Sequence, residues 1–147
     1  MIFFGNAPIL WQAKKNTDEG CSSTHNEVMA LTQASKAVVH IRKLVEDMNF
    51  DPSVTMDATP MLGDNRQALK WSREDYITPG NRYYARDLRY SKRRVEDGTC
   101  DTRYIAGEDN LVDIGTKSVK VATFKHLVPH VTGYGGLLPP LPEGYKT

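Results

Sequence analysis

The stretch that decides the fold is "THNEVMALTQASKAVVHIRKLVEDM", residues 24–48. Apolar or small side chains recur along it in alternating steps of three and four, at Leu31, Ala34, Val38, Ile41, Val45 and Met48. This spacing predicts an amphipathic helix from about Thr24 to Met48, with one buried stripe. The same series begins with a carboxylate, Glu27. An acid at the head of a buried stripe needs an explanation.

The segments around this helix predict strands and further helices. Two short apolar runs, residues 1–4 and 8–15, flank a Gly-Asn turn and indicate a β-hairpin. The later expected elements, in chain order, are a strand at 54–65, a short helix at 66–72, a helix at 82–98, a strand at 99–107 and a helix at 108–131. The last helix is weakened by Gly115 and is expected to end near Pro129. This order predicts an α/β fold, in which helices pack against a small mixed sheet.

Composition places the chain among ordinary globular proteins. It has 147 residues, 39% hydrophobic and 25% charged, with a formal charge of +1. This predicts one domain over residues 1–131, followed by a Gly- and Pro-rich extended tail over 132–147. Two widely spaced cysteines, Cys21 and Cys100, favour a reducing intracellular compartment over secretion. The start has no basic leader, and no apolar run reaches the roughly 20 residues of a membrane span.

Three carboxylates lie where a strand or loop is expected to meet a helix. Glu27 follows Thr24 by three residues, the spacing of a capping box. Asp64 ends a predicted strand, where an Asx turn or a helix cap is common. Asp113 follows Asn110 by three residues, so a cap also explains it. Taken one at a time, all three have an ordinary structural explanation.

Taken together, the same acids suggest a metal site. Hard divalent cations bind several oxygen ligands, and strand ends in open α/β sheets are where site residues are presented. Two Mg²⁺ ions about 3.5–4 Å apart activate water and stabilise the leaving oxygen in phosphodiester cleavage. Glu27, Asp64 and Asp113 are therefore the candidate catalytic and metal-binding residues.

Four segments in order carry a resemblance to a known family. They are "PILWQAKK" (8–15), "SSTHNEVMALTQASK" (22–36), "LGDNRQAL" (62–69) and "EDNLVDIGTK" (108–117). With "RRVEDG" (93–98), they resemble the ribonuclease H domain of copia-type retrotransposon polyproteins, over about residues 2–128. The resemblance implies a ribonuclease H-like mixed sheet with flanking helices. It also implies that Glu27, Asp64 and Asp113 are ligands of catalytic Mg²⁺ beneath an RNA/DNA hybrid.

The chain departs from that family at its beginning. The family has one earlier strand, which carries a fourth carboxylate that bridges both metal ions, and this sequence starts at the equivalent of the second strand. The resemblance therefore predicts a domain whose first strand is missing and whose catalysis is severely impaired or absent, because metal affinity depends on ligand number. It also predicts an open sheet edge at residues 1–4, to which a partner chain can add a strand.

Two further segments suggest binding surfaces. Arginines recur in steps of four and three along one face of the helix expected at 82–98, at Arg82, Arg86, Arg89 and Arg93. Such a face is commonly only solvated, but arginines with nearby tyrosines also suit RNA, an RNA/DNA hybrid or an acidic protein surface. The tail presents apolar side chains on a stiff extended backbone, suited to a groove on a partner protein, at Leu137, Leu138, Pro139, Pro140 and Leu141.

These patterns lead to two hypotheses about function. The first is a non-catalytic ribonuclease H-like domain that acts as an accessory or structural interaction subunit of a larger complex and needs no cofactor. The second is a Mg²⁺-dependent ribonuclease H that cleaves RNA in RNA/DNA hybrids. In that case the fourth carboxylate comes from another segment or chain.

Overall fold

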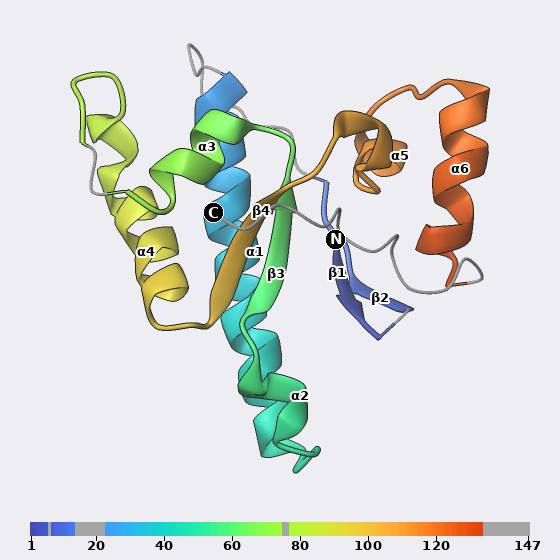
Figure 1. Ribbon diagram of the computed structural model, residues 1–147, viewed down its shortest axis with the longest axis horizontal. Coiled ribbons are helices and arrows are strands. Elements are labelled where there is room, and N and C mark those ends of the chain that lie inside the picture. The colour runs from blue at the N-terminus through green and yellow to red at the C-terminus, as the bar shows by residue number, and fades with distance from the viewer. Residues whose placement is uncertain (6, 14–22, 75–76, 134–147) are drawn as a thin grey trace. The chain divides into compact units, whose positions relative to one another are not determined.

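The computed structural model describes residues 1–5, 7–13, 23–74 and 77–133 (Figure 1). The chain divides into two compact units. We call residues 17–104 the middle unit, and residues 1–16 together with 105–147 the terminal unit.

The middle unit contains a helix-rich α/β arrangement. Its elements are α1 (Ser23–Asp47), α2 (Ser53–Met56), β3 (Thr59–Gly63), α3 (Arg66–Trp71), the 3-10 turn η1 (Arg82–Tyr84), α4 (Ala85–Glu96) and β4 (Cys100–Tyr104). Strands β3 and β4 pair in parallel, with Thr59 opposite Cys100 and Gly63 opposite Tyr104. The segment with α3 and α4 forms the crossover between them, as parallel pairing requires (Figure 1).

Helices cover one face of the β3–β4 pair. Helix α1 packs against β3, α3 and α4. Leu31, Val38 and Val45 of its predicted stripe are buried, and Val28 is buried as well although the series did not include it. The expectation for Met48 is wrong, because α1 ends at Asp47 and Met48 is 59% exposed. Val28 joins Ala68, Tyr84 and Leu88 in the core, and Trp71 packs against this cluster. The predicted helices at 24–48 and 66–72 are therefore confirmed to within one residue at their ends. The helix predicted at 82–98 is confirmed over 85–96, and residues 82–84 form the 3-10 turn η1 before it.

One prediction in this unit is wrong. Residues 54–56 were expected in a strand, yet they lie in the single helical turn α2, and β3 begins only at Thr59. The Asp51 carboxylate accepts a hydrogen bond from the Ser53 backbone N–H at 2.9 Å, and Pro52 has a helical φ of −53°. Local capping thus overrides the β-propensity of Val54 and Thr55.

The described residues of the terminal unit form a hairpin and three helical segments. Strands β1 (Ile2–Phe4) and β2 (Ala7–Leu10) pair antiparallel, as predicted, although β2 is shorter than expected. Gly5 has a φ of 59°, which glycine adopts without strain. The helical segments are η2 (Gly107–Asp109), α5 (Asp113–Thr116) and α6 (Val121–Val131).

The single helix predicted at 108–131 is therefore wrong. Lys117, with φ −135° and ψ 156°, is extended and separates α5 from α6. Pro129 does not end α6, because the helix continues through it to Val131. It stops where the Thr132 N–H donates to the Val128 carbonyl at 3.0 Å and Gly133 adopts a φ of 78°.

The fold class is mixed α/β, as expected. The described residues hold two separate two-stranded sheets, β1–β2 and β3–β4, where one mixed sheet was predicted. Cys100 is a free, buried thiol, and Cys21 lies outside the described residues. No helix in the part of the chain that the structure describes is long and apolar enough to cross a membrane.

Candidate functional site

Glu27 lies in the second turn of α1 and is half-buried. The helix begins at Ser23, so Thr24 is inside it and does not take the N-cap position that the capping box required. Val28, the next residue, is 1% exposed and belongs to the core. Glu27 is thus placed at the border of the core by the burial of its neighbour.

Asp64 follows β3 directly, at the carboxyl end of the parallel strand pair. The helix cap there is its neighbour Asn65, whose Oδ1 accepts a hydrogen bond from the Ala68 backbone N–H at 3.0 Å. The capping explanation considered for Asp64 therefore belongs to Asn65. Because α1 packs on both β3 and α3, Glu27 and Asp64 come from elements that contact one another.

Asp113 begins α5 in the terminal unit. Its side chain is 14% exposed, and its Oδ1 and Oδ2 lie 2.9 and 3.1 Å from Lys117 Nζ. Asn110 caps the turn just before this helix, because its Oδ1 accepts from the Val112 backbone N–H at 3.3 Å. Asp113 is thus a largely buried carboxylate with an ammonium group on both oxygens.

The three acids suit Mg²⁺ by donor type, since it prefers carboxylate oxygens. Glu27 and Asp64 belong to the middle unit and Asp113 to the terminal unit. Among the residues that the structure describes, no three or more His, Cys, Asp or Glu side chains form a group able to hold a metal ion.

Helix α4 separates an apolar face from a cationic one. Tyr84, Leu88 and Ser91 are buried and Val95 is half-buried, so these residues form the packing stripe of η1 and α4. The four arginines named above from the sequence, in η1 and α4, are all exposed. We call Arg82, Arg86, Arg89 and Arg93 the arginine face.

The cations of α4 differ in how they are neutralised. Lys92 Nζ lies 3.2 Å from Glu96 Oε1, and Arg94 Nη2 lies 3.0 Å from Asp97 Oδ2. Both of these cations are partly buried. By contrast, no carboxylate among the described residues forms an ion pair with the three α4 members of the arginine face. The helix thus uses two cations for its own fold and presents the others to solvent.

An aromatic ring lies next to the arginine face. Tyr83 is 82% exposed, and the Arg82 guanidinium carbon lies 5.2 Å from its ring centroid. Arg82 Nη2 also donates to the Tyr83 hydroxyl at 3.3 Å. A hollow that includes Arg89 of the arginine face is lined by Glu74, Ile77, Leu88, Arg89 and Lys92. An exposed tyrosine with an arginine is a combination that can stack on a base.

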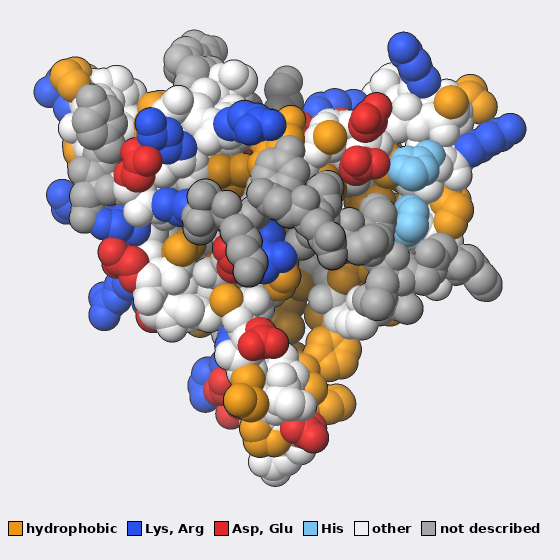
Figure 2. All heavy atoms as spheres, viewed as in Figure 1, with side chains coloured by type: hydrophobic (Ala, Val, Ile, Leu, Met, Phe, Trp, Pro, Cys, Tyr) orange, Lys and Arg blue, Asp and Glu red, His pale blue; other side chains and the backbone are white. Residues whose placement is uncertain are grey.

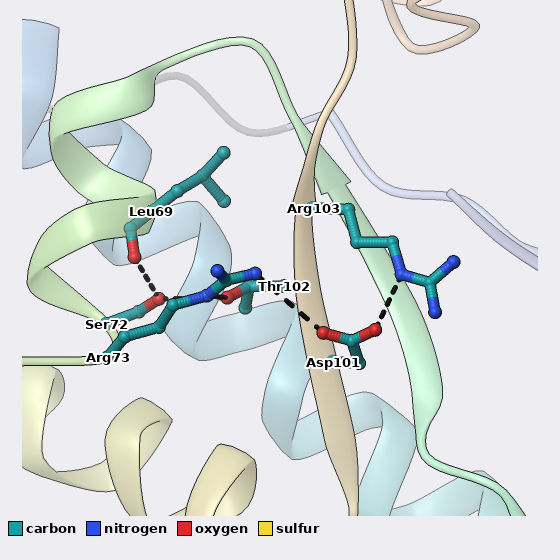
Figure 3. Close-up of polar contacts among 6 residues, drawn as sticks. All are labelled: Leu69, Ser72, Arg73, Asp101, Thr102 and Arg103. Carbon is teal, nitrogen blue, oxygen red and sulfur yellow. Dashed lines mark hydrogen bonds and ion pairs between the residues drawn. The ribbon is translucent and has the colours of Figure 1, made fainter. Parts of the chain in front are cut away.

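A second polar cluster, which sequence reasoning missed, surrounds β4 (Figure 3). Arg73 Nε donates to Thr102 Oγ1 at 3.0 Å, and its Nη2 lies 3.8 Å from Asp101 Oδ1. Arg103 pairs with the other carboxylate oxygen of Asp101. Ser72 Oγ donates to the Leu69 carbonyl at 2.7 Å, next to Thr102. These contacts tie α3 to β4, so the cluster is structural.

The tail residues proposed to bind a partner, residues 137–141, lie outside the described residues.

Comparison with known proteins adds no assignment: no family model, no curated protein and no solved structure matches this chain.

Proposed function

We propose that this chain is a ribonuclease H-like domain of the copia type that acts as an interaction subunit of a larger assembly and binds nucleic acid through its arginine face. The observation that carries the binding surface is the division of cations on α4. Lys92 and Arg94 have carboxylate partners at 3.2 and 3.0 Å, whereas Arg86, Arg89 and Arg93 are exposed without one among the described residues. Exposed arginines in a row that form no close ion pair attract a polyanion.

Nucleic acid suits this row better than a compact acidic patch does. From Arg86 to Arg93 the helix rises about 10 Å, which spans about three phosphates of one strand. Guanidinium groups bind phosphate oxygens in a bidentate fashion. Tyr83, beside Arg82, offers an exposed ring to a base. The sequence resemblance supplies the ribonuclease H-like assignment and points to the same ligand class.

An interaction role is favoured over nuclease activity by the state of Asp113. Its two carboxylate oxygens are both contacted by the Lys117 ammonium, so a divalent cation would have to displace that group. The second candidate, a Mg²⁺-dependent ribonuclease H, is favoured by Asp64. This residue directly follows a parallel strand, and its neighbour Asn65 caps the next helix.

The binding proposal is tested by fluorescence anisotropy with a labelled RNA/DNA hybrid across a salt series. We expect Arg86→Glu together with Arg89→Glu to weaken binding at least about tenfold and to reduce the slope of log K against log salt by about 2. The matched control is Lys120→Glu with Lys125→Glu, the same charge change on exposed residues of the terminal unit. If both pairs weaken binding equally, or the hybrid does not bind, the arginine face is not the site.

A nuclease assay separates the two candidate functions. The hybrid is incubated with the chain and Mg²⁺, with Asp64→Asn as the comparison. Cleavage by the unaltered chain that disappears in Asp64→Asn establishes the nuclease and overturns the interaction-only role. No cleavage, with binding that depends on the arginine face, supports the proposed function.

A further inference from the structure

The end of α1, the turn that follows it and the helix α2 together expose five large apolar side chains. We call this set the apolar patch: Leu44, Met48, Phe50, Val54 and Met56. Met56 is 78% exposed and Met48 is 59% exposed. In Figure 2 apolar side chains lie among acidic ones at the lower end of the view, over α2. Contiguous exposed apolar surface with a polar rim marks an interaction site more often than a scattered apolar residue does.

The backbone beneath the patch is held by specific hydrogen bonds. At the end of α1, the Phe50 N–H donates to the Val45 carbonyl at 3.4 Å, and Asn49 takes a left-handed φ of 55°. This is the pattern of a Schellman motif. Arg42 Nη1 donates to the Asp57 carbonyl at 2.8 Å and to Thr59 Oγ1 at 3.0 Å. The apolar side chains therefore project from a segment whose backbone conformation is fixed by hydrogen bonds.

The border of the patch is acidic. Residues 42–57 contain two cations and four acids, a formal charge of −2. Both cations are engaged, because Arg42 donates to backbone carbonyls and Lys43 Nζ lies 3.3 Å from Asp47 Oδ1. Glu46, Asp51 and Asp57 are exposed acids that form no ion pair with a cation of the described residues. The pKa of Asp51 is lowered mainly by a hydrogen bond from the Ser53 backbone N–H and also by one from the Ser53 side chain, so this carboxylate is ionised.

We propose that the apolar patch is a docking site for an amphipathic helix of a partner protein whose apolar stripe is bordered by lysine or arginine. Leu44 and Met48 form an exposed i, i+4 row, the kind of ridge that packs against another helix. The acidic border complements basic residues beside the partner's stripe and disfavours acidic partners. The site lies apart in sequence from the arginine face, and its ligand is cationic where that of the arginine face is anionic.

The test uses the full chain and synthetic helical peptides, followed by fluorescence anisotropy. The probe has leucine on one face and lysine on the rest, and it is compared with a leucine/glutamate peptide and a scrambled leucine/lysine peptide. We expect Leu44→Ser with Met56→Ser to weaken binding of the probe at least about tenfold. The matched control, Val121→Ser with Phe124→Ser, removes exposed apolar side chains from α6 and should change binding less than about twofold.

A second variant keeps the proposal falsifiable if the first one fails to fold. Glu46→Gln with Asp57→Asn leaves the apolar side chains in place but removes the complementary charge. We expect it to weaken binding of the probe, and the salt dependence of that binding should not become steeper. Arg86→Glu with Arg89→Glu should not weaken it, so failure here is distinct from failure of the nucleic-acid proposal. The proposal is overturned if the probe does not bind or if the scrambled peptide binds equally well. It is also overturned if the α6 control variant loses as much affinity for the probe as the patch variant does. Self-association of the chain that Met56→Ser abolishes also overturns it, because the occupant is then a second copy.

Discussion

The Thr32 hydroxyl on α1 lies 3.1 Å from the Ser91 hydroxyl on α4 and donates to the Asp87 carbonyl at 3.2 Å. Because the Thr32 hydrogen is used by Asp87, Ser91 is the donor to Thr32. Thr32 and Ser91 are 1% and 2% exposed. Two helices that are far apart in sequence are thus joined by buried hydroxyls, and each hydroxyl has a partner.

Replacing Thr32 with valine should destabilise the middle unit. The substitution keeps the shape but leaves the Ser91 hydroxyl buried without its acceptor, at a cost of about 1–2 kcal/mol in the free energy of unfolding. Urea denaturation followed by circular dichroism measures this change. Thr32→Val with Ser91→Ala should cost less than the sum of the single changes, because the two side chains share one interaction. Strict additivity would show that the two hydroxyls do not interact.

The cluster around β4 predicts unequal costs for neighbouring residues. Thr102 is 1% exposed and accepts from Arg73, so Thr102→Val should destabilise by about 1–3 kcal/mol. Asp101 pairs with Arg73 and Arg103 but is partly exposed, so solvent screens its ion pairs. Asp101→Asn should therefore cost less than about 1 kcal/mol. Equal losses in urea denaturation would contradict this division.

Sequence periodicity was sufficient for the long helices of the middle unit. The stripe of α1 is uniform over many turns, and α4 has both its packing stripe and the terminal Gly98, whose φ is 74°. Short elements were harder, because α2 depends on the Asp51 cap and the Arg42 hydrogen bonds rather than on propensity. Residues 108–131 contain too few strong helix formers around Gly115 to hold one continuous helix.

The candidate surfaces were predictable to different degrees. The spacing of arginines predicted one exposed face, but it did not reveal that Arg94 pairs with Asp97, since that depends on the turn after α4. The hydrogen bonds between Thr32 and Ser91 and between Arg73 and Thr102 join residues 59 and 29 positions apart. Pairs of this kind follow from tertiary packing and leave no local pattern. The same is true of the apolar patch, whose residues look like ordinary core positions in the sequence.

Arg42 should control the order of the segment around α2. It donates to the carbonyls of Thr55 and Asp57 and to Thr59 Oγ1. Arg42→Met keeps much of the aliphatic stem but removes these donors, so we expect a loss of about 1–3 kcal/mol. Hydrogen exchange should also speed up in residues 54–59 more than elsewhere. The neighbouring change Lys43→Ala, at an exposed ion pair, should stay within about 0.5 kcal/mol; an equal effect would rule out the specific role of Arg42.

The buried thiol of Cys100 should make stability fall in alkaline solution. Burial raises the pKa of Cys100 from 9.0 to about 11, so between these values the unfolded chain loses a proton that the folded chain keeps. The stabilisation from the neutral thiol is complete below pH 9 and is lost as pH rises towards 11, by at most about 3 kcal/mol. Urea unfolding from pH 8 to 11 measures this in a Cys21→Ala background, where Cys100 is the single thiol.

The matched protein for this pH series also carries Cys100→Ala. Tyrosines and lysines titrate in both proteins, so the difference between the two curves isolates the thiol. We expect the difference in the free energy of unfolding to be constant near pH 8. Above pH 9 the cysteine-containing protein should lose stability relative to Cys100→Ala. The same burial should slow the reaction of the folded Cys100 with a thiol reagent at pH 8, because the thiolate is the reactive form. A pH-independent difference, together with rapid labelling of the folded chain, would show that Cys100 ionises as an exposed thiol does.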